Sequence, residues 1–235
     1  MTTETTAAAN APLGLRESKK QETRQLISDA ATRLFLDQGF EQTTIAEIAA
    51  AARVAKKTVT NYFAHKEDLA LDHQDAFTGS LAATVTGRAP GESALTALRD
   101  AFADAAGAED PVAGFSGPEF ARMVADSPTL TARLRDLHDL RETRLAEALA
   151  EATGAASDDI TVRTAAALLG SVHRMLFDRI QELTLAGWTD ARISDDVTAA
   201  GAYAFGLLEA PLAGYAVRDA LDAPADPAAP HELVL

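Results

Sequence analysis

The sequence contains no cysteine among its 235 residues, and aromatic side chains make up only 6% of it. Without cysteine, disulfide frameworks, thiolate nucleophiles and cysteine-ligated metal sites are excluded. No stretch approaches the roughly 20 apolar residues that a membrane-spanning helix needs, and the N-terminus lacks the cationic start and apolar run of a signal peptide. We therefore expect a soluble cytoplasmic protein with no membrane partner.

Apolar residues nonetheless make up 47% of the chain, chiefly as alanine and leucine. This composition favours helices over sheets, and the length suffices to bury a real core. No segment shows the alternation of a half-buried strand, and no repeat of fixed period is present. The sequence therefore predicts an all-α protein of roughly nine helices.

Positive charge is scarce and unevenly placed in a chain of formal charge −14. Residues 1–66 contain nine basic and seven acidic residues, whereas the remainder contains 12 basic and 28 acidic ones. All the lysines lie in that first segment: Lys19, Lys20, Lys56, Lys57 and Lys66. This asymmetry indicates a small head that faces a polyanion and a larger acidic body.

Apolar spacing and stop signals define the expected helices. Apolar residues recur at intervals of three and four from Ser18 to the stop at Gly39, and Thr44 with Glu47 has the spacing of a capping box. The expected helices span 18–38, 45–51, 55–62, 66–87, 92–107, 118–125, 128–152, 158–186 and 190–217. Residues 1–17 and 220–235 are expected to be a disordered arm and tail.

The second and third of these helices, joined by a tight turn, make a helix-turn-helix. Small or apolar residues stand where the two helices cross: Ile48, Ala49, Val54 and Val59. The outer face of the second helix carries side chains that suit base edges in the major groove of DNA. These predicted base-facing residues are Lys56, Lys57, Thr58, Thr60 and Asn61, and the predicted phosphate contacts are Thr44, Tyr62, His65 and Lys66.

Residues 24–69, RQLISDAATRLFLDQGFEQTTIAEIAAAARVAKKTVTNYFAHKEDL, resemble the N-terminal domain of TetR-family transcriptional regulators. The shared pattern begins with an arginine that is followed at intervals by Ile, Ala-Ala and Leu-Phe. It continues through Thr-Thr-Ile, Thr-Val and Tyr-Phe and ends with Lys-Glu-Asp-Leu. One position departs from it, because Arg53 stands where the family has a glycine before the turn valine. A non-glycine residue in the left-handed region costs on the order of 1 kcal/mol, so the turn is either strained or closed differently.

The resemblance implies a helix-turn-helix domain over 18–65 and a domain for ligand binding and dimerisation over 66–219. It implies a transcriptional regulator and not an enzyme, most often a repressor in this family, which a small effector releases from double-stranded DNA. The alternative within the class is an activator or a global regulator with no small effector. Segments 160–185 and 197–216 are apolar around much of their circumference, which favours a homodimer closed by a four-helix bundle and hence a palindromic operator. The alternative from another class is an all-helical small-molecule binder or metal sensor that does not bind DNA.

The sequence shows no pattern of catalytic or metal-binding residues. The histidines have no metal-ligand spacing, and no nucleophile elbow, Walker loop or Rossmann glycine pattern is present, so we expect no catalytic residue, metal or cofactor. Polar and aromatic residues of the body are instead candidates for an effector cavity. They are His73, Phe77, Phe102, Phe120, Met123, His138, His173, Arg174 and Phe177. The acidic body is compatible with a cationic effector and equally with a role in solubility alone.

Overall fold

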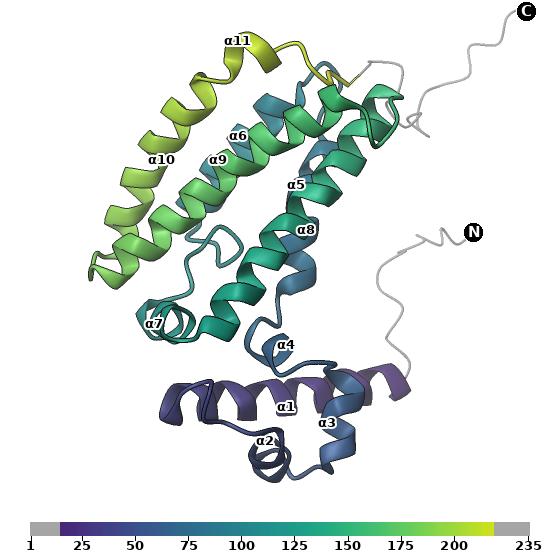
Figure 1. The fold of residues 1–235 in the computed structure, drawn as a ribbon. Helices are drawn as coiled ribbons and strands as arrows, with labels where there is room; N and C mark the ends of the chain where they lie inside the picture. The colour runs from purple at the N-terminus through teal and green to yellow at the C-terminus, as the bar shows by residue number, and fades with distance from the viewer. Residues whose placement is uncertain (1–14, 219–235) are drawn as a thin grey trace, which may run out of the picture. The chain divides into compact units, whose positions relative to one another are not determined.

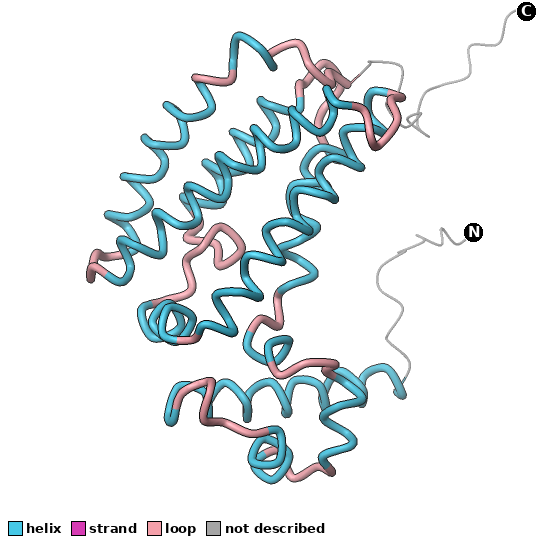
Figure 2. The backbone as a smooth tube through the Cα atoms, viewed as in Figure 1, coloured by secondary structure: helices cyan, strands magenta, loops and turns pink. Residues whose placement is uncertain are grey.

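The computed structural model describes residues 15–218, and these residues form eleven helices and no strand (Figure 2). The all-α expectation is confirmed. The predicted tail 220–235 and most of the predicted arm 1–17 lie outside the described residues. The chain divides into two compact units between Asp72 and His73, whereas the sequence placed the domain boundary after residue 65.

The first unit contains four helices, shown in purple and blue in Figure 1. They are α1 (Leu15–Gln38), α2 (Ile45–Ala51), α3 (Lys56–Tyr62) and α4 (Glu67–Ala70). Helix α1 packs against α2 and α4, and α2 packs against α3. The core of this unit consists of side chains that are almost wholly buried, chiefly Ile27, Phe35, Phe40, Ile48, Val59 and Leu69.

The second unit contains seven helices, and its long members run side by side (Figure 1). They are α5 (Gln74–Gly87), α6 (Ala94–Gly107), α7 (Pro118–Asp126), α8 (Pro128–Thr153), α9 (Ile160–Leu185), α10 (Asp190–Gly206) and α11 (Glu209–Leu212). Helix α5 packs along α8, α8 along α9, and α10 against both α6 and α9. Leucine, alanine, valine and phenylalanine side chains from all of these helices except α7 form one continuous core.

Local sequence signals explain where several of these helices begin and end. The side chains of Ser93, Ser127 and Asp159 accept hydrogen bonds from backbone N–H groups in the first turns of α6, α8 and α9. Helix α8 ends at Gly154, whose φ of 66° is one that glycine adopts without a steric penalty.

Three expectations about helix boundaries are wrong. The expected helix over 66–87 is two helices, because the chain leaves the helical conformation at Leu71 (φ −112°, ψ 53°) and Asp72 accepts a hydrogen bond from Ser28 Oγ (2.9 Å). The expected helix over 190–217 ends at Gly206 and a short α11 follows, in which Pro211 lacks the N–H that a continuous helix would need. Helix α1 also begins by Leu15, inside the expected arm.

Candidate functional site

The capping box at the start of α2 is present as the sequence predicts. Thr44 Oγ1 accepts a hydrogen bond from the Glu47 N–H (3.3 Å), and the Thr44 N–H donates to Glu47 Oε2 (2.8 Å). The Thr44 hydroxyl donates to the same carboxylate oxygen (2.8 Å). The backbone and side-chain hydrogen bonds from Thr44 lower the pKa of Glu47. This box fixes the direction in which α2 leaves the preceding loop.

The turn between α2 and α3 is closed by a Schellman motif. The Val54 N–H donates to the Ala49 carbonyl (2.9 Å), and the Arg53 N–H donates to the Ala50 carbonyl (3.1 Å). Arg53 stands in the left-handed region with φ 55°. The turn therefore closes in the way that favours glycine, and the arginine bears the steric cost of its Cβ in that conformation.

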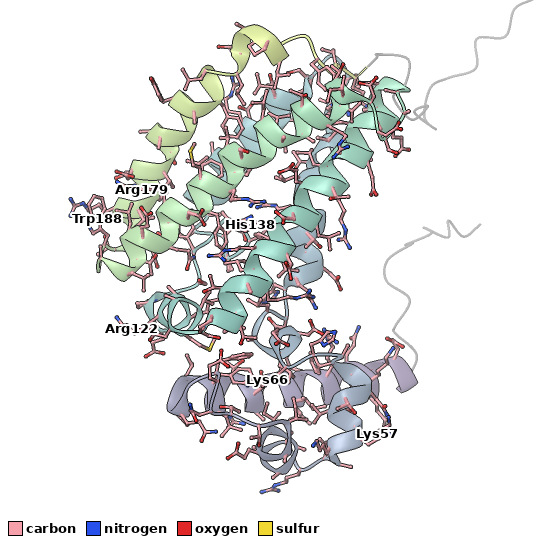
Figure 3. The ribbon with its side chains drawn as sticks, in the orientation of Figure 1. Lys57, Lys66, Arg122, His138, Arg179 and Trp188 are labelled. Atoms are coloured by element: carbon pink, nitrogen blue, oxygen red, sulfur yellow. The ribbon has the colours of Figure 1, made fainter. Side chains whose placement is uncertain are left out.

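Helix α3 presents a polar face to solvent. Lys56, Lys57, Thr60 and Asn61 are exposed and Thr58 is half-buried, whereas Val59 is fully buried against the rest of the unit. Figure 3 labels Lys57 on this helix. All five predicted base-facing residues therefore lie on one two-turn helix, whose buried valine fixes which way that helix faces.

The chain leaving α3 is held to α1. Arg24 Nη1 donates to the Tyr62 carbonyl (3.2 Å), and its guanidinium lies 4.4 Å from the ring centre of Phe63. Tyr62 is half-buried and His65 is exposed, with the His65 N–H donating to Asp68 Oδ2 (3.0 Å). Tyr62, the last residue of α3, and His65, three positions later, are the residues predicted to contact phosphate, and both thus lie on this tethered part of the chain.

Lys66 has internal contacts that the sequence did not indicate. Its Nζ donates to the carbonyls of Phe40 (2.9 Å) and Thr43 (3.1 Å) and lies 4.2 Å from the ring centre of Phe40. A third carbonyl, that of Glu41, is 3.5 Å away. The ammonium group thereby closes the loop between α1 and α2, which positions the N-terminus of α2. Figure 3 labels Lys66.

A cavity of about 160 Å³ lies inside the second unit, between α5, α6, α8, α9 and the loop after α6. Phe102 forms part of its apolar wall. Its polar lining consists of Ser80, Thr84, Asp110, Arg141 and His173. Two of the predicted effector residues, Phe102 and His173, therefore lie on this cavity. Their rings are in edge-to-face contact at 5.8 Å.

Helix α10 closes on Phe102 because residue 201 is glycine. A Cβ atom at Gly201 would lie 3.0 Å from Phe102 Cε1, tighter than an ordinary van der Waals contact, so any other residue there would force the Phe102 ring or α10 to shift. The loop after α6 is also fixed in place. Gln181 Nε2 donates to the Gly114 carbonyl (2.6 Å), and Ser194 Oγ donates to the Ala106 carbonyl (2.8 Å). The cavity walls are thus held by contacts from α9 and α10.

Three more predicted effector residues form an aromatic cluster. Phe77, His138 and Phe177 contact one another with ring centres 5.0 to 5.6 Å apart, and Figure 3 labels His138. The Arg141 guanidinium lies 4.5 Å from the centre of the Phe77 ring, which connects this cluster to the lining of the cavity.

Burial keeps the two inner histidines neutral. It lowers the pKa of His138 to about 4 and that of His173 to about 3, and the positive charge of Arg141 lowers both further. Neither Nε2 atom has a hydrogen-bond partner among the described residues.

The remaining effector candidates lie away from the cavity lining. His73 is the exposed N-cap residue of α5, and Arg174 pairs with Asp139 at 2.6 Å. Phe120 and Met123 are half-buried and buried on α7.

The sequence reasoning missed Arg141 as a site residue, although the signal was present. Arg141 follows Leu137 and precedes Leu145 at intervals of four, so it occupies a core position on α8. A charged residue in an apolar stripe indicates an internal polar function.

No metal or membrane site emerges from residues 15–218. That part of the chain has no group of three histidine, aspartate or glutamate side chains able to hold one ion. None of its helices combines the length and hydropathy that crossing a bilayer requires.

The chain matches known regulators in sequence. The family model of bacterial regulatory proteins of the tetR family matches residues 27–72. The HTH-type transcriptional regulator TcmR of Streptomyces glaucescens is 33% identical over 181 residues, which cover 74% of this chain and 80% of TcmR. The chain belongs to the TetR family of transcriptional regulators. The resemblance seen in residues 24–69 is thereby confirmed and extends into the second unit.

Solved structures share the fold at low identity. The SmeT–triclosan complex has a TM-score of 0.52 at 20% identity and covers 91% of this chain and 100% of SmeT. Native NalD, the secondary repressor of the MexAB-OprM efflux pump in Pseudomonas aeruginosa, has a TM-score of 0.51 at 18% identity, covering 78% of this chain and 97% of NalD. At these identities the likeness concerns the fold alone.

Proposed function

We propose that this TetR-family regulator is a dimeric repressor that binds a palindromic operator through α3 and leaves it when a small effector occupies the cavity of the second unit. The exposed polar face of α3 is the observation that carries the proposal. It concentrates two of the chain's five lysines on one short helix whose opposite side is buried.

The side chains of α3 suit the grooves of duplex DNA. Lysine reaches guanine acceptors or phosphates, threonine offers a hydroxyl and a methyl group, and Asn61 can pair with both hydrogen-bonding positions of adenine. Tyr62, His65, Thr44 and Lys66 are proposed to contact or position backbone phosphates. For Lys66 the internal contacts favour positioning, since its ammonium already binds two carbonyls at 2.9 and 3.1 Å.

Dimerisation is proposed to use the outer faces of α9 and α10. Met175 is 59% exposed and Leu168, two turns earlier on α9, is 39% exposed. Tyr203 on α10 and Leu207, the C-cap residue four positions later, are 72% and 65% exposed. Large apolar side chains at helical spacing on two adjacent helices favour burial against a second copy. A twofold dimer would present two copies of α3 to two half-sites.

The effector acts by conformational preference. A ligand in the cavity releases DNA only if it binds more tightly to a conformation whose two heads do not fit successive major grooves. The cavity is suited to this because its lining comes from four helices and a loop, so a ligand changes the packing of several elements together.

The DNA proposal is tested with the double variant Lys56→Ala/Lys57→Ala and with Tyr62→Phe. Binding to the DNA upstream of the protein's own coding sequence is measured by fluorescence anisotropy across a salt titration. We expect the double variant to bind at least 10-fold more weakly, with a shallower salt dependence, because each lost phosphate contact lowers the slope by about 0.9.

Arg122→Ala is the matched control, since Arg122 is an exposed cation on α7 of the second unit (Figure 3). Its affinity and salt slope should equal those of the wild type. Unchanged binding by the double variant would contradict a DNA-reading role for α3 and favour a ligand-binding protein that does not act on DNA.

A further inference from the structure

The charge inside the cavity points to the class of ligand. Arg141 is buried in the second unit, 6% exposed, and lines the cavity. Its Nε donates to Ser80 Oγ (3.0 Å) and its guanidinium lies over the Phe77 ring. Within residues 15–218 no carboxylate forms an ion pair with Arg141, and its terminal nitrogens donate no hydrogen bond.

Such an arrangement is costly in a protein that has no anion for it. A buried charge is ordinarily paired, because removing it from water without a partner costs several kcal/mol. Burial lowers the pKa of Arg141 only to about 10, so the side chain is still a cation at neutral pH. The same positive charge also lowers the pKa of His138 and His173, after burial, which is the larger cause for both.

The other groups on the lining do not supply the missing anion. Asp110 is the carboxylate of the lining, and its Oδ1 accepts the Val112 N–H (2.7 Å) within the loop. It forms no ion pair with Arg141, whose pKa is lowered by burial. Ser80 and Thr84 offer hydroxyl groups, and Phe102 offers a ring face or edge.

We propose that the effector is a small aromatic acid, whose anionic oxygen pairs with the guanidinium of Arg141 and whose ring packs on Phe102. This inference rests on the proposed function, since it names the ligand of the proposed effector cavity. Size supports a single-ring compound, because a cavity of about 160 Å³ is close to the ~150 Å³ that accommodates benzene in an engineered protein cavity. An arginine fork matches two carboxylate oxygens, which adds geometric selectivity to the charge.

The test uses pairs of probes that differ in charge and hardly in shape. Benzoate, salicylate and 4-hydroxybenzoate are each compared with the corresponding neutral amide by isothermal titration calorimetry against the full-length protein. We expect at least one acid to bind 10- to 100-fold more tightly than its amide, the range expected for a hydrogen-bonded charge pair.

Arg141→Met keeps the apolar stem and removes the charge. We expect it to abolish the preference for the acid, and Arg141→Lys to retain part of it. Arg144→Met is the matched control, because Arg144 lies almost one turn further along α8, binds Thr78 Oγ1 (2.6 Å) and does not line the cavity. It should preserve the preference.

The inference is overturned if the amides bind the wild type as tightly as the acids, if no acid of the panel binds, or if Arg141→Met binds the acids like the wild type. The wild-type comparison alone decides the matter should Arg141→Met not fold. Operator release is measured separately by anisotropy. Acid binding through Arg141 without DNA release would contradict the proposed function and leave the ligand class intact. Release of the operator by a neutral compound, independent of Arg141, would contradict the ligand class and leave the proposed function intact.

Discussion

Replacing Arg53 with glycine should stabilise the protein, although it removes a charged side chain from a surface turn. Arg53 has φ 55° at the position of a Schellman motif where glycine is preferred. A residue with a Cβ destabilises the folded state by roughly 1 to 2 kcal/mol there. Glycine itself lowers stability by about 0.4 to 1 kcal/mol, because it has more conformational freedom in the unfolded chain. The net gain is therefore between about 0 and 1.6 kcal/mol, which corresponds to a rise in Tm of up to roughly 3–6 °C for a chain of this size.

The control for this change is Arg53→Ala, which removes the guanidinium and keeps the strained conformation. Urea unfolding followed by circular dichroism gives the free energy of unfolding, and amide hydrogen exchange in α2 and α3 gives the local effect. We expect the glycine variant to exceed the alanine variant in both. Equal stability of the two variants would refute the claim that the turn is strained.

The same pair of variants decides whether Arg53 also binds DNA. Its side chain is exposed next to α3, so a guanidinium that contacts phosphate would be lost equally in Arg53→Gly and Arg53→Ala. Both variants would then bind the operator more weakly, with a salt slope smaller by about 1. An unchanged slope would assign Arg53 no phosphate contact.

Three further outcomes follow from single contacts. Stability should fall as the pH drops from about 6.5 toward 4, because the unfolded chain protonates His138 and His173 while the folded chain, with pKa values of about 4 and 3, does not. At pH 5 the two histidines together should lower the free energy of unfolding by roughly 4 kcal/mol relative to its value above pH 7. The double variant with phenylalanine at both positions should show a flatter pH profile in urea unfolding, and an unchanged profile would contradict this assignment. Thr44→Ala should lower the free energy of unfolding by about 1 kcal/mol and Thr44→Ser by much less, as measured in urea, because only the alanine variant loses the cap; equal losses would point to packing instead. Met175→Glu should shift the protein from dimer to monomer in sedimentation velocity at micromolar concentration, because it places a charge on the exposed apolar face of α9. The control Arg122→Glu on α7 should remain dimeric. A dimeric Met175→Glu protein would place the interface elsewhere.

The sequence predicts the first unit in more detail than the second because its signals are local. The capping box at Thr44 and Glu47 and the turn at Arg53 each depend on residues within five positions of one another. The start and end of α2 follow from these signals. Lys66 is the exception, since its partners Phe40 and Thr43 lie more than 20 positions away and no periodicity relates them.

The cavity is beyond such reasoning because its lining converges from distant segments. Ser80 and Arg141 are in contact 61 positions apart, and the periodicity of α5 and α8 shows which faces are buried and not which side chains meet. Aromatic residues were therefore predicted as one group, and the structure divides them between the cavity and the cluster at His138. The break after α4 was missed for a similar reason, since it coincides with a hydrogen bond between Ser28 and Asp72.

The total charge of −14 is a poor guide to either partner of this protein. Exposed charges more than about 8 Å from a ligand are largely screened at physiological salt, whereas a charge in a buried cavity acts through a medium of low dielectric constant. The acidic surface therefore contributes little to the charge preference of the cavity, which depends on Arg141. By the same reasoning, the proposed approach to DNA through the lysines of α3 does not conflict with an acidic net charge, because local potential at the contact, and not the net charge, determines the affinity.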